Sequence, residues 1–260
     1  MNLLSRASSR PTERIVVGVD LAAGRGVTAI AALRLTVGDS EARASLSLLN
    51  QGSMANDAAI IAEVARWQPS VVGIDAPLSL PVVVAAAVRG DASPVDSSPF
   101  TRAAERDPSW SRLGVRPFPV SFLAGLTFRA IPLAARLREE QPAAQVIEVF
   151  PSATLLALGL ASPSPHAQRH PRKTSPDRRR ATQRMLAHFV AGLAPAADDE
   201  QPLGADHLDA ILAALTCAAV ALGAAQALGD PAEGCIMLPA RSAHDLFVAN
   251  ITSHTAYHLK

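Results

Sequence analysis

Cysteine and net charge are both scarce in this sequence, and each shortage excludes a class of protein. The 260 residues include two cysteines, Cys217 and Cys235, and their separation matches neither a zinc-binding motif nor a disulfide framework. The formal net charge is only +1, which excludes general electrostatic attraction to nucleic acid. Any contact with nucleic acid would have to come from a local basic patch.

Convincing membrane segments are also missing. Residues 1–13 lack an apolar core of signal-peptide length, and we expect them to form a flexible N-terminal tail. Residues 210–229 carry no charge, but they are mostly Ala with few Leu, Ile or Val, which favours a buried helix over a membrane span. We therefore expect a soluble, cytoplasmic protein with no membrane partner.

What the chain has is enough apolar material for a large core. Apolar residues make up 49% of it and charged residues 18%, so a folded domain is expected rather than disorder. The length suits one large α/β domain or two small ones, and we interpret residues 14–260 as a single domain.

The chain is organised around residues 14–20, Arg-Ile-Val-Val-Gly-Val-Asp. A short run rich in Ile and Val predicts a buried central strand, and this one ends in a carboxylate, Asp20. Residues 71–75, Val-Val-Gly-Ile-Asp, repeat the arrangement and end in Asp75. An acid at the end of a buried strand can leave the core and face a site.

The elements around these two strands predict a mixed sheet. Strands at 26–35 and 42–49 complete an antiparallel meander, and a helix at 55–67 leads to the parallel strand at 71–75. The later elements that we expect are a strand at 145–150, a helix at 151–159, a helix from 175, a long helix at 205–228 and a strand at 234–238.

Residues 76–142 differ in composition from the rest, being rich in Pro, Arg and aromatic residues. We expect an inserted subdomain with one or two short helices and long ordered loops. Clustered Arg and aromatic side chains could stack on bases and hold phosphates. Equally, the aromatics could form a small core beneath solvated arginines, and the sequence favours neither interpretation.

Acidic residues form the pattern with the clearest chemical meaning. Asp206 and Asp209 lie three apart at the start of the long helix, so they share one face of an otherwise apolar element. The helix N-terminus favours acids, which explains Asp206 better than Asp209, and a divalent cation would neutralise both. Asp20 and Asp75 end two strands and Glu148 lies within a third, in an orientation that the sequence does not decide.

Should these acids converge, oxygen ligands alone suit Mg²⁺ or Mn²⁺ rather than Zn²⁺. Two such ions about 3.5–4 Å apart can drive phosphodiester hydrolysis. The sequence has no Ser-His-Asp order, Walker loop or Cys-rich metal spacing that points to a competing chemistry.

Four stretches together resemble a known family: Val17-Gly-Val-Asp-Leu-Ala22, Val72-Gly-Ile-Asp-Ala-Pro77, Glu148-Val-Phe-Pro-Ser-Ala153 and Asp206-His-Leu-Asp-Ala210. In order and spacing they are similar to the domain of unknown function 429 family, described as predicted RNase H-like nucleases. The stretch 205–215 is also similar to the acidic C-terminal helix of Holliday-junction resolvases. The resemblance implies an RNase H-like α/β fold and metal-dependent cleavage of nucleic acid.

The residues expected to carry this activity are few. The resemblance implies the catalytic acids Asp20, Asp75, Glu148, Asp206 and Asp209, and all of them except Glu148 are expected to bind Mg²⁺ or Mn²⁺. We also predict a basic surface that holds the phosphates of DNA or RNA, formed by Arg102, Arg106, Arg169, Arg172, Lys173 and Arg178.

Two alternatives stay open. An actin- or sugar-kinase-like nucleotide-binding protein also opens with a Gly-x-Asp strand, but it needs a second domain for which this chain is short. A non-catalytic adaptor that keeps the RNase H fold fits the low net charge and the Ala-rich helix equally well.

Overall fold

The strands form one mixed sheet in the computed structural model, which describes residues 12–24, 26–37, 44–91, 100–160 and 175–248. They are β1 (Thr12–Asp20), β2 (Thr28–Val37), β3 (Ala44–Met54), β4 (Val71–Ile74), β5 (Gln145–Val149), β6 (Val190–Ala191), β7 (Ala225–Asp230) and β8 (Gly234–Pro239). The helices are α1 (Asp57–Trp67), α2 (Val82–Arg89), α3 (Ala103–Arg106), α4 (Ser109–Leu113), the 3₁₀ helix η1 (Val120–Leu123), α5 (Ala124–Glu140), α6 (Pro151–Ala157), α7 (Pro176–Phe189), α8 (Ala205–Ala221) and α9 (Arg241–Val248).

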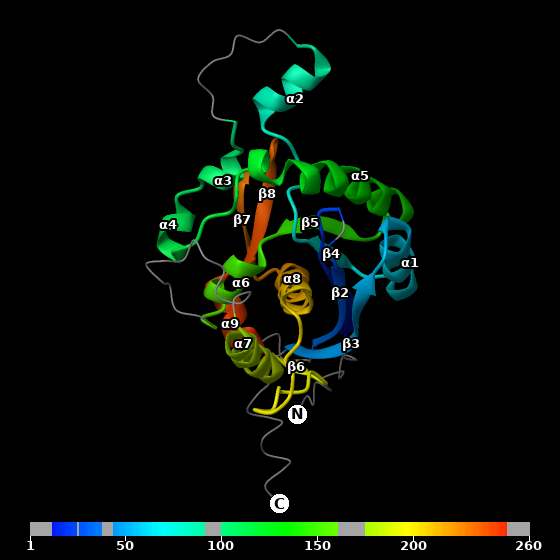
Figure 1. Cartoon of the computed structure of the whole chain (residues 1–260), viewed down its shortest axis with the longest axis vertical. Helices are drawn as coiled ribbons and strands as arrows, with labels where there is room; N and C mark the ends of the chain where they lie inside the picture. Colours follow the sequence, from blue (N-terminus) through cyan, green and yellow to red (C-terminus); the bar gives the residue numbers. More distant parts are fainter. Residues whose placement is uncertain (1–11, 25, 38–43, 92–99, 161–174, 249–260) are drawn as a thin grey trace, which may run out of the picture.

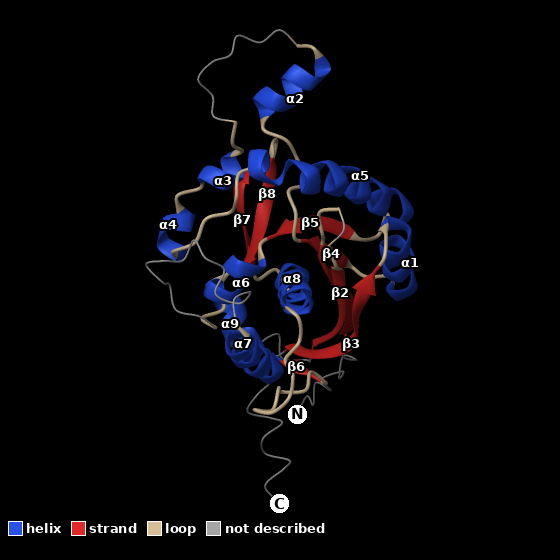
Figure 2. Cartoon of the chain, in the orientation of Figure 1, coloured by secondary structure: helices blue, strands red, loops and turns tan. Residues whose placement is uncertain are grey.

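The sheet has the order β6-β3-β2-β1-β4-β5-β8-β7. The first three strands pair antiparallel as a meander, whereas β4, β5 and β8 continue parallel from β1 (Figure 1). This confirms the predicted α/β fold with a mixed sheet flanked by helices (Figure 2).

Helices cover both faces of the sheet. On one face α8 lies in the curve of the strands, where its Ala-rich surface packs with side chains of α6, α7 and α9 against β1, β2 and β4 (Figure 1). On the other face α1 and α5 pack through Ile60, Val64, Leu133 and Leu137. A smaller core forms around Trp110, between α3 and α4 and the β7–β8 hairpin.

Helix α1 shows how the local sequence sets an element's limits. Asn56 precedes it, and its side chain accepts a hydrogen bond from the Ala59 amide at 2.9 Å. The buried positions Ile60, Ile61 and Val64 fall on one face, at helical spacing. The expected helix at 55–67 is therefore found almost at its predicted limits.

The long helix predicted at 205–228 is wrong in its last seven residues. Helix α8 ends at Ala221, Gly223 adopts φ +68°, and residues 225–230 form strand β7, which pairs antiparallel with β8. Ala, Leu and Gln favour a helix locally, but pairing along the whole of β8 outweighs that preference.

The segment 76–142 holds more helix than predicted. Besides α2, α3, α4 and η1, it contains the 17-residue helix α5, which continues through Pro132. The window Val120–Glu140 is long and apolar enough to cross a membrane by length and composition alone. About 33% of that window is buried inside the fold, and Ala130, Leu133, Ala134 and Leu137 pack against the sheet. The expected N-terminal tail lies almost wholly outside the described residues.

Candidate functional site

Two glycines let α8 approach the sheet closely. Gly18 in β1 and Gly73 in β4 are paired in register, two residues before Asp20 and Asp75. A Cβ atom at Gly18 would lie 2.9 Å from the carbonyl carbon of Ala213, and closer still to backbone atoms of Ala210 and Ala214. A Cβ atom at Gly73 would lie 2.6 Å from the sulfur of Cys217. The paired glycines thus form a trough that only a helix of small residues can occupy.

Side chains alternate between the two faces of a strand, so residues two apart lie on the same face. Asp20 and Asp75, two residues beyond the paired glycines, therefore lie on the face that α8 covers. The amide of Asp75 donates to the carbonyl of Val19 at 2.8 Å, so the two acids leave adjacent strands side by side. The Asp20 side chain is nearly buried, with the residue 8% exposed. The structure therefore brings together the two strand-end acids, as the sequence predicts.

The direction of α8 brings its first turn to the same place. Its residues 210–214 meet Gly18, whereas Cys217, further along the helix, donates to the carbonyl of Val17 at 3.4 Å. The helix therefore runs opposite to β1, and its N-terminus points toward the end of the strand that carries Asp20. Asp206 is half-buried and Asp209 is 4% exposed.

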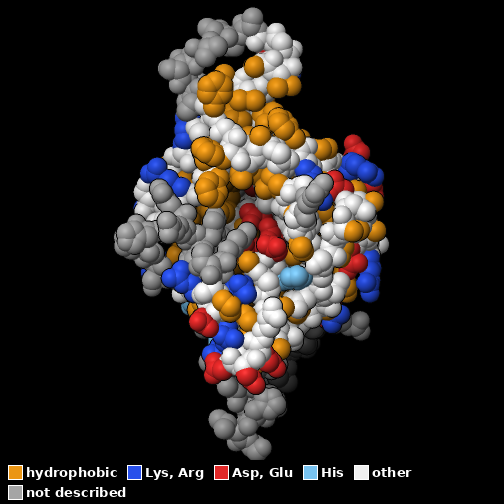
Figure 3. Space-filling model, viewed as in Figure 1, with side chains coloured by type: hydrophobic (Ala, Val, Ile, Leu, Met, Phe, Trp, Pro, Cys, Tyr) orange, Lys and Arg blue, Asp and Glu red, His pale blue; other side chains and the backbone are white. Residues whose placement is uncertain are grey.

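Acidic side chains consequently gather at one spot. Figure 3 shows them in a depression in the middle of the face on which α8 is seen end-on, next to a histidine side chain. At a helix N-terminus, partial positive charge favours each carboxylate by about 0.3–1 kcal/mol. The spot combines carboxylate oxygens from β1, the end of β4 and α8, which is a donor set for hard cations.

The four aspartates are not a closed metal cage. Among the residues that the structure describes, no group of three or more His, Cys, Asp or Glu side chains is arranged to hold a metal ion. Mg²⁺ in proteins commonly takes one or two carboxylates and completes its shell with water and substrate phosphates. The oxygen-only set fits an ion bound in that open manner, and it does not fit a structural zinc site.

Glu148 lies on the opposite face of the sheet, which corrects its prediction as a catalytic acid. It pairs in register with Ile74, a residue of the α1 and α5 core, while its neighbour Val149 packs on the α8 side. The alternation of β5 thus directs Glu148 away from Asp20 and Asp75. The orientation that the sequence left undecided is the one that excludes Glu148 from the acidic site.

Glu148 is instead half of a buried ion pair. Two nitrogens of Arg102 donate to its two carboxylate oxygens at 2.6 Å each, and Arg102 also donates to Glu105 at 2.9 Å and to Ser79 at 3.0 Å. Burial raises the pKa of Glu148, and Arg102 opposes that shift. The two carboxylates raise the pKa of Arg102 above its usual value against the effect of burial, so the guanidinium stays charged.

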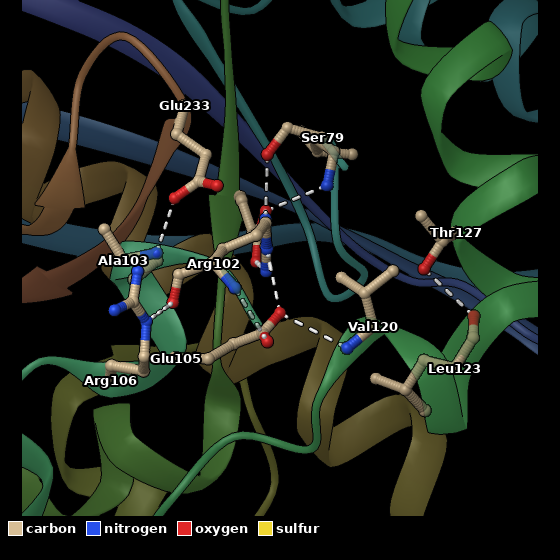
Figure 4. A network of polar contacts seen from close by, with 12 residues as sticks. Ser79, Arg102, Ala103, Glu105, Arg106, Val120, Leu123, Thr127 and Glu233 are labelled. Carbon is tan, nitrogen blue, oxygen red and sulfur yellow. Dashed lines mark hydrogen bonds and ion pairs between the residues drawn. The ribbon is translucent and has the colours of Figure 1, made fainter. Parts of the chain in front are cut away.

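Arg102, which the sequence predicts to be part of a substrate-binding surface, is instead buried in this network. It is 1% exposed, and three side chains occupy its guanidinium (Figure 4). A phosphate could reach it only after this network had opened, which would leave two buried carboxylates without their cation.

The Arg102 network holds the segment that follows Asp75. Glu148 accepts from the amide of Leu78 at 2.8 Å, so one ion pair fixes residues 78–79. Glu233, in the turn between β7 and β8, accepts from the amides of Val82 and Ala103 at 2.9 and 2.5 Å (Figure 4). Glu233 thus connects the first residue of α2 with the first residue of α3.

Arg129 does the same for the segment that follows Asp20, and the sequence analysis missed this role. Its guanidinium donates to Asp57 at 2.6 and 2.8 Å, and to the carbonyl of Ala22 at 2.5 Å. The hydroxyl of Thr28 accepts from Arg129 at 3.3 Å and from the amide of Ala22 at 3.1 Å. Because Arg136 and Arg138 lie on the same helix, nothing in the sequence distinguishes Arg129 from them.

His207 was also overlooked, although it lies between Asp206 and Asp209. Its Nε2 is 3.4 Å from the hydroxyl of Ser53 in β3, which joins the start of α8 to the end of the meander. The side chain is half-buried at the edge of the acidic site. Its position inside the quoted Asp-His-Leu-Asp motif could have suggested it.

The remaining predicted basic residues are scattered. Arg106 and Arg178 are exposed, on α3 and α7 respectively. Arg169, Arg172 and Lys173 lie outside the described residues. The structure therefore does not gather the predicted basic surface into one described patch.

Comparison with known proteins gives one match. A family model described as protein of unknown function (DUF429) matches residues 18–234. No curated protein and no solved structure matches the chain.

Proposed function

This chain belongs to the DUF429 family, and on that premise we propose that it is a nuclease that depends on Mg²⁺ or Mn²⁺. The observation that supports the proposal most is the Gly18–Gly73 trough, because it brings the first turn of α8 to the ends of β1 and β4. Acids from three parts of the chain meet there, in a fold that has no structural need to collect like charges.

Asp20 and Asp209 are the residues that would hold the ion, and Asp75 and Asp206 would complete its surroundings. When bound, a divalent ion activates water and stabilises the charge that develops on the oxygens of a phosphodiester. The near-complete burial of Asp20 and Asp209 strengthens their interaction with a cation, because water screens it less.

Other residues of this chain would orient the acids. The Arg129 contacts fix the backbone after Asp20, and the Glu148–Arg102 pair fixes the backbone after Asp75. Catalysis through positioned charges needs such a rigid frame, because misplacement by about 1 Å can cost on the order of 100-fold in rate. His207, at the edge of the site, is placed to accept or donate a proton.

The substrate that we propose is the phosphodiester backbone of DNA or RNA. Arg106 and Arg178, with Arg169, Arg172 and Lys173 as predictions from the sequence, would contact its phosphates at a distance from the acids. We further propose a cytoplasmic location, which the buried face of α5 favours over a membrane one.

Cleavage assays with conservative variants test the proposal. We expect wild-type protein to cleave oligonucleotides when Mg²⁺ or Mn²⁺ is present and to stop when EDTA is added. Asp20→Asn and Asp209→Asn keep the shape of the side chain but remove its charge. Each should reduce cleavage by more than the roughly 10–100-fold that follows loss of an outer-shell partner. The matched control is Asp199→Asn, an exposed acid outside the site, which should cleave like wild type.

Undiminished cleavage by a folded Asp20→Asn variant would refute the assignment. If no oligonucleotide is cleaved by any of these proteins, the adaptor alternative is favoured. Thermal stabilisation by ATP with Mg²⁺, beyond that by Mg²⁺ alone, would favour the nucleotide-binding alternative.

A further inference from the structure

Exposed phenylalanines are concentrated in one part of the chain. Four of the seven phenylalanines, Phe100, Phe118, Phe122 and Phe128, have exposed fractions of 62%, 47%, 81% and 61%. The other three, Phe150, Phe189 and Phe247, pack into hydrophobic clusters. We name the four exposed residues the phenylalanine surface. So much exposed aromatic area needs an explanation.

The phenylalanine surface is close in the chain to two arginines that hold the backbone beyond the acids. Phe128 precedes Arg129, which bonds to the carbonyl of Ala22, two residues past Asp20. Phe100 lies two residues before Arg102, which bonds to Ser79, four residues past Asp75. Figure 3 agrees, because it shows apolar side chains above the depression that holds the acidic ones. Apolar side chains therefore border the depression, and Phe100 and Phe128 belong to the segments that hold the backbone beyond the acids.

The charge around the surface favours an anionic partner. Arg106, Arg112 and Arg116 are exposed within the same stretch of chain. Their hydrogen bonds go to neutral oxygens, a backbone carbonyl at 3.4 Å and serine hydroxyls at 2.8 and 3.3 Å. One acid of the stretch, Asp107, is near enough to Arg112 for the guanidinium to help lower its pKa, which leaves the three arginines in excess. Glu105, in the same stretch, is buried against Arg102. Aromatic rings beside arginines are the combination that proteins use to bind unpaired bases and their phosphates.

We propose that the phenylalanine surface binds unpaired bases, so that the substrate of the acidic site is single-stranded nucleic acid. This rests on the proposed nuclease function for its catalytic part, but not for its binding part. Unpaired bases offer their ring faces for stacking, whereas a duplex keeps those faces inside its base stack. A strand stacked on Phe128 would lie on α5, the helix whose Arg129 holds the backbone two residues beyond Asp20. DNA and RNA share this chemistry.

Binding measured without cleavage tests the proposal. Fluorescence anisotropy in EDTA would compare single-stranded DNA and RNA oligonucleotides with blunt duplexes of the same sequence. Single strands should bind at least tenfold more tightly than duplexes. Phe122→Leu and Phe128→Leu keep most of the apolar area but remove the ring, and each should weaken single-strand binding about tenfold or more. Phe122→Trp keeps an aromatic ring, so it should bind single strands as tightly as the wild-type protein does. Val88→Ala, which removes an exposed aliphatic group, should leave single-strand binding unchanged.

Each outcome separates this proposal from the nuclease proposal. Single-strand binding that depends on the rings, without any cleavage, supports the phenylalanine surface and refutes the nuclease. Equal affinity for duplexes, or unchanged binding by both Leu variants, refutes the surface whether or not Mg²⁺ supports cleavage. A third outcome is that no oligonucleotide binds and sedimentation shows that the protein self-associates. If the Phe→Leu variants retain this self-association and Phe122→Asp abolishes it, the surface contacts a second copy of the chain, and the proposal is refuted.

Discussion

Replacing Gly18 by alanine would separate α8 from the strand that carries Asp20. The added methyl group would meet backbone atoms of Ala210, Ala213 and Ala214, the nearest of which cannot move away as a side chain can. Overpacking a core commonly costs about 1–3 kcal/mol, and a backbone obstacle puts this substitution at or above the upper end of that range. We therefore expect Gly18→Ala to cost about 3 kcal/mol or more.

For a chain of this length, each kcal/mol lowers Tm by about 2–4 °C, so the variant should melt at least about 6 °C below wild type. Thermal unfolding followed by circular dichroism measures this. Gly125→Ala is the matched control, because Gly125 lies in α5 and a Cβ atom there has nothing within 4 Å. The control should be neutral or gain up to about 1 kcal/mol, since alanine favours the helix.

The same substitution should also damage the acidic site. Moving α8 off Gly18 moves Asp209 away from Asp20, so metal-dependent cleavage by Gly18→Ala should fall even at temperatures where the protein stays folded. A Tm within about 2 °C of wild type, with full activity, would refute the close packing of α8 on β1 from which the site has been derived.

Two further predictions concern buried groups. Arg102→Met leaves Glu148 and Glu105 buried without their cation, and it should lower the free energy of unfolding, measured with denaturant, by about 3–5 kcal/mol. Combining it with Glu148→Leu should recover part of that loss. Equal stability of the single variant and the wild-type protein would contradict the buried pair. Cys217 is fully buried and Cys235 is half-buried, and the pKa of both thiols is raised above the usual value, mainly by burial. In the native protein a thiol reagent should therefore modify only Cys235, and slowly, whereas both thiols should react after unfolding. Rapid modification of two thiols in the native state would show that α8 is not packed as described.

The sequence predicts well what local pattern determines. Short runs of Val and Ile ending in Asp20 and Asp75 mark the two central strands, and their order with α1 is enough to predict a mixed sheet. The apolar spacing within α1 predicts that helix to within two residues of its observed limits. In each case, neighbours along the chain supply the information.

The errors arise where distant residues decide. Residues 225–230 resemble a helix by composition and form a strand because β8 pairs with them. Glu148 looks like a third strand-end acid, but the face it occupies depends on the register of β5 with β4. Arg102 looks like a surface arginine, and only the folded chain brings it to Glu148.

The glycines show a signal that was present but not interpreted. Both Gly18 and Gly73 stand two residues before a predicted catalytic acid, within the motifs Val-Gly-Val-Asp and Val-Gly-Ile-Asp. In a strand, glycine often marks the close approach of another backbone. Interpreted in that way, the two motifs would have predicted a helix of small residues against this face.

The most direct test of the central claim is a titration of the wild-type protein and its Asp20→Asn and Asp209→Asn variants with Mn²⁺, followed by electron paramagnetic resonance. If acids from β1 and α8 meet at one cation site, the wild-type protein should bind Mn²⁺, and either substitution should weaken that binding by on the order of tenfold or more, with Asp199→Asn unaffected. Mn²⁺ binding that neither substitution changes, or no binding by the wild-type protein, would contradict the claim.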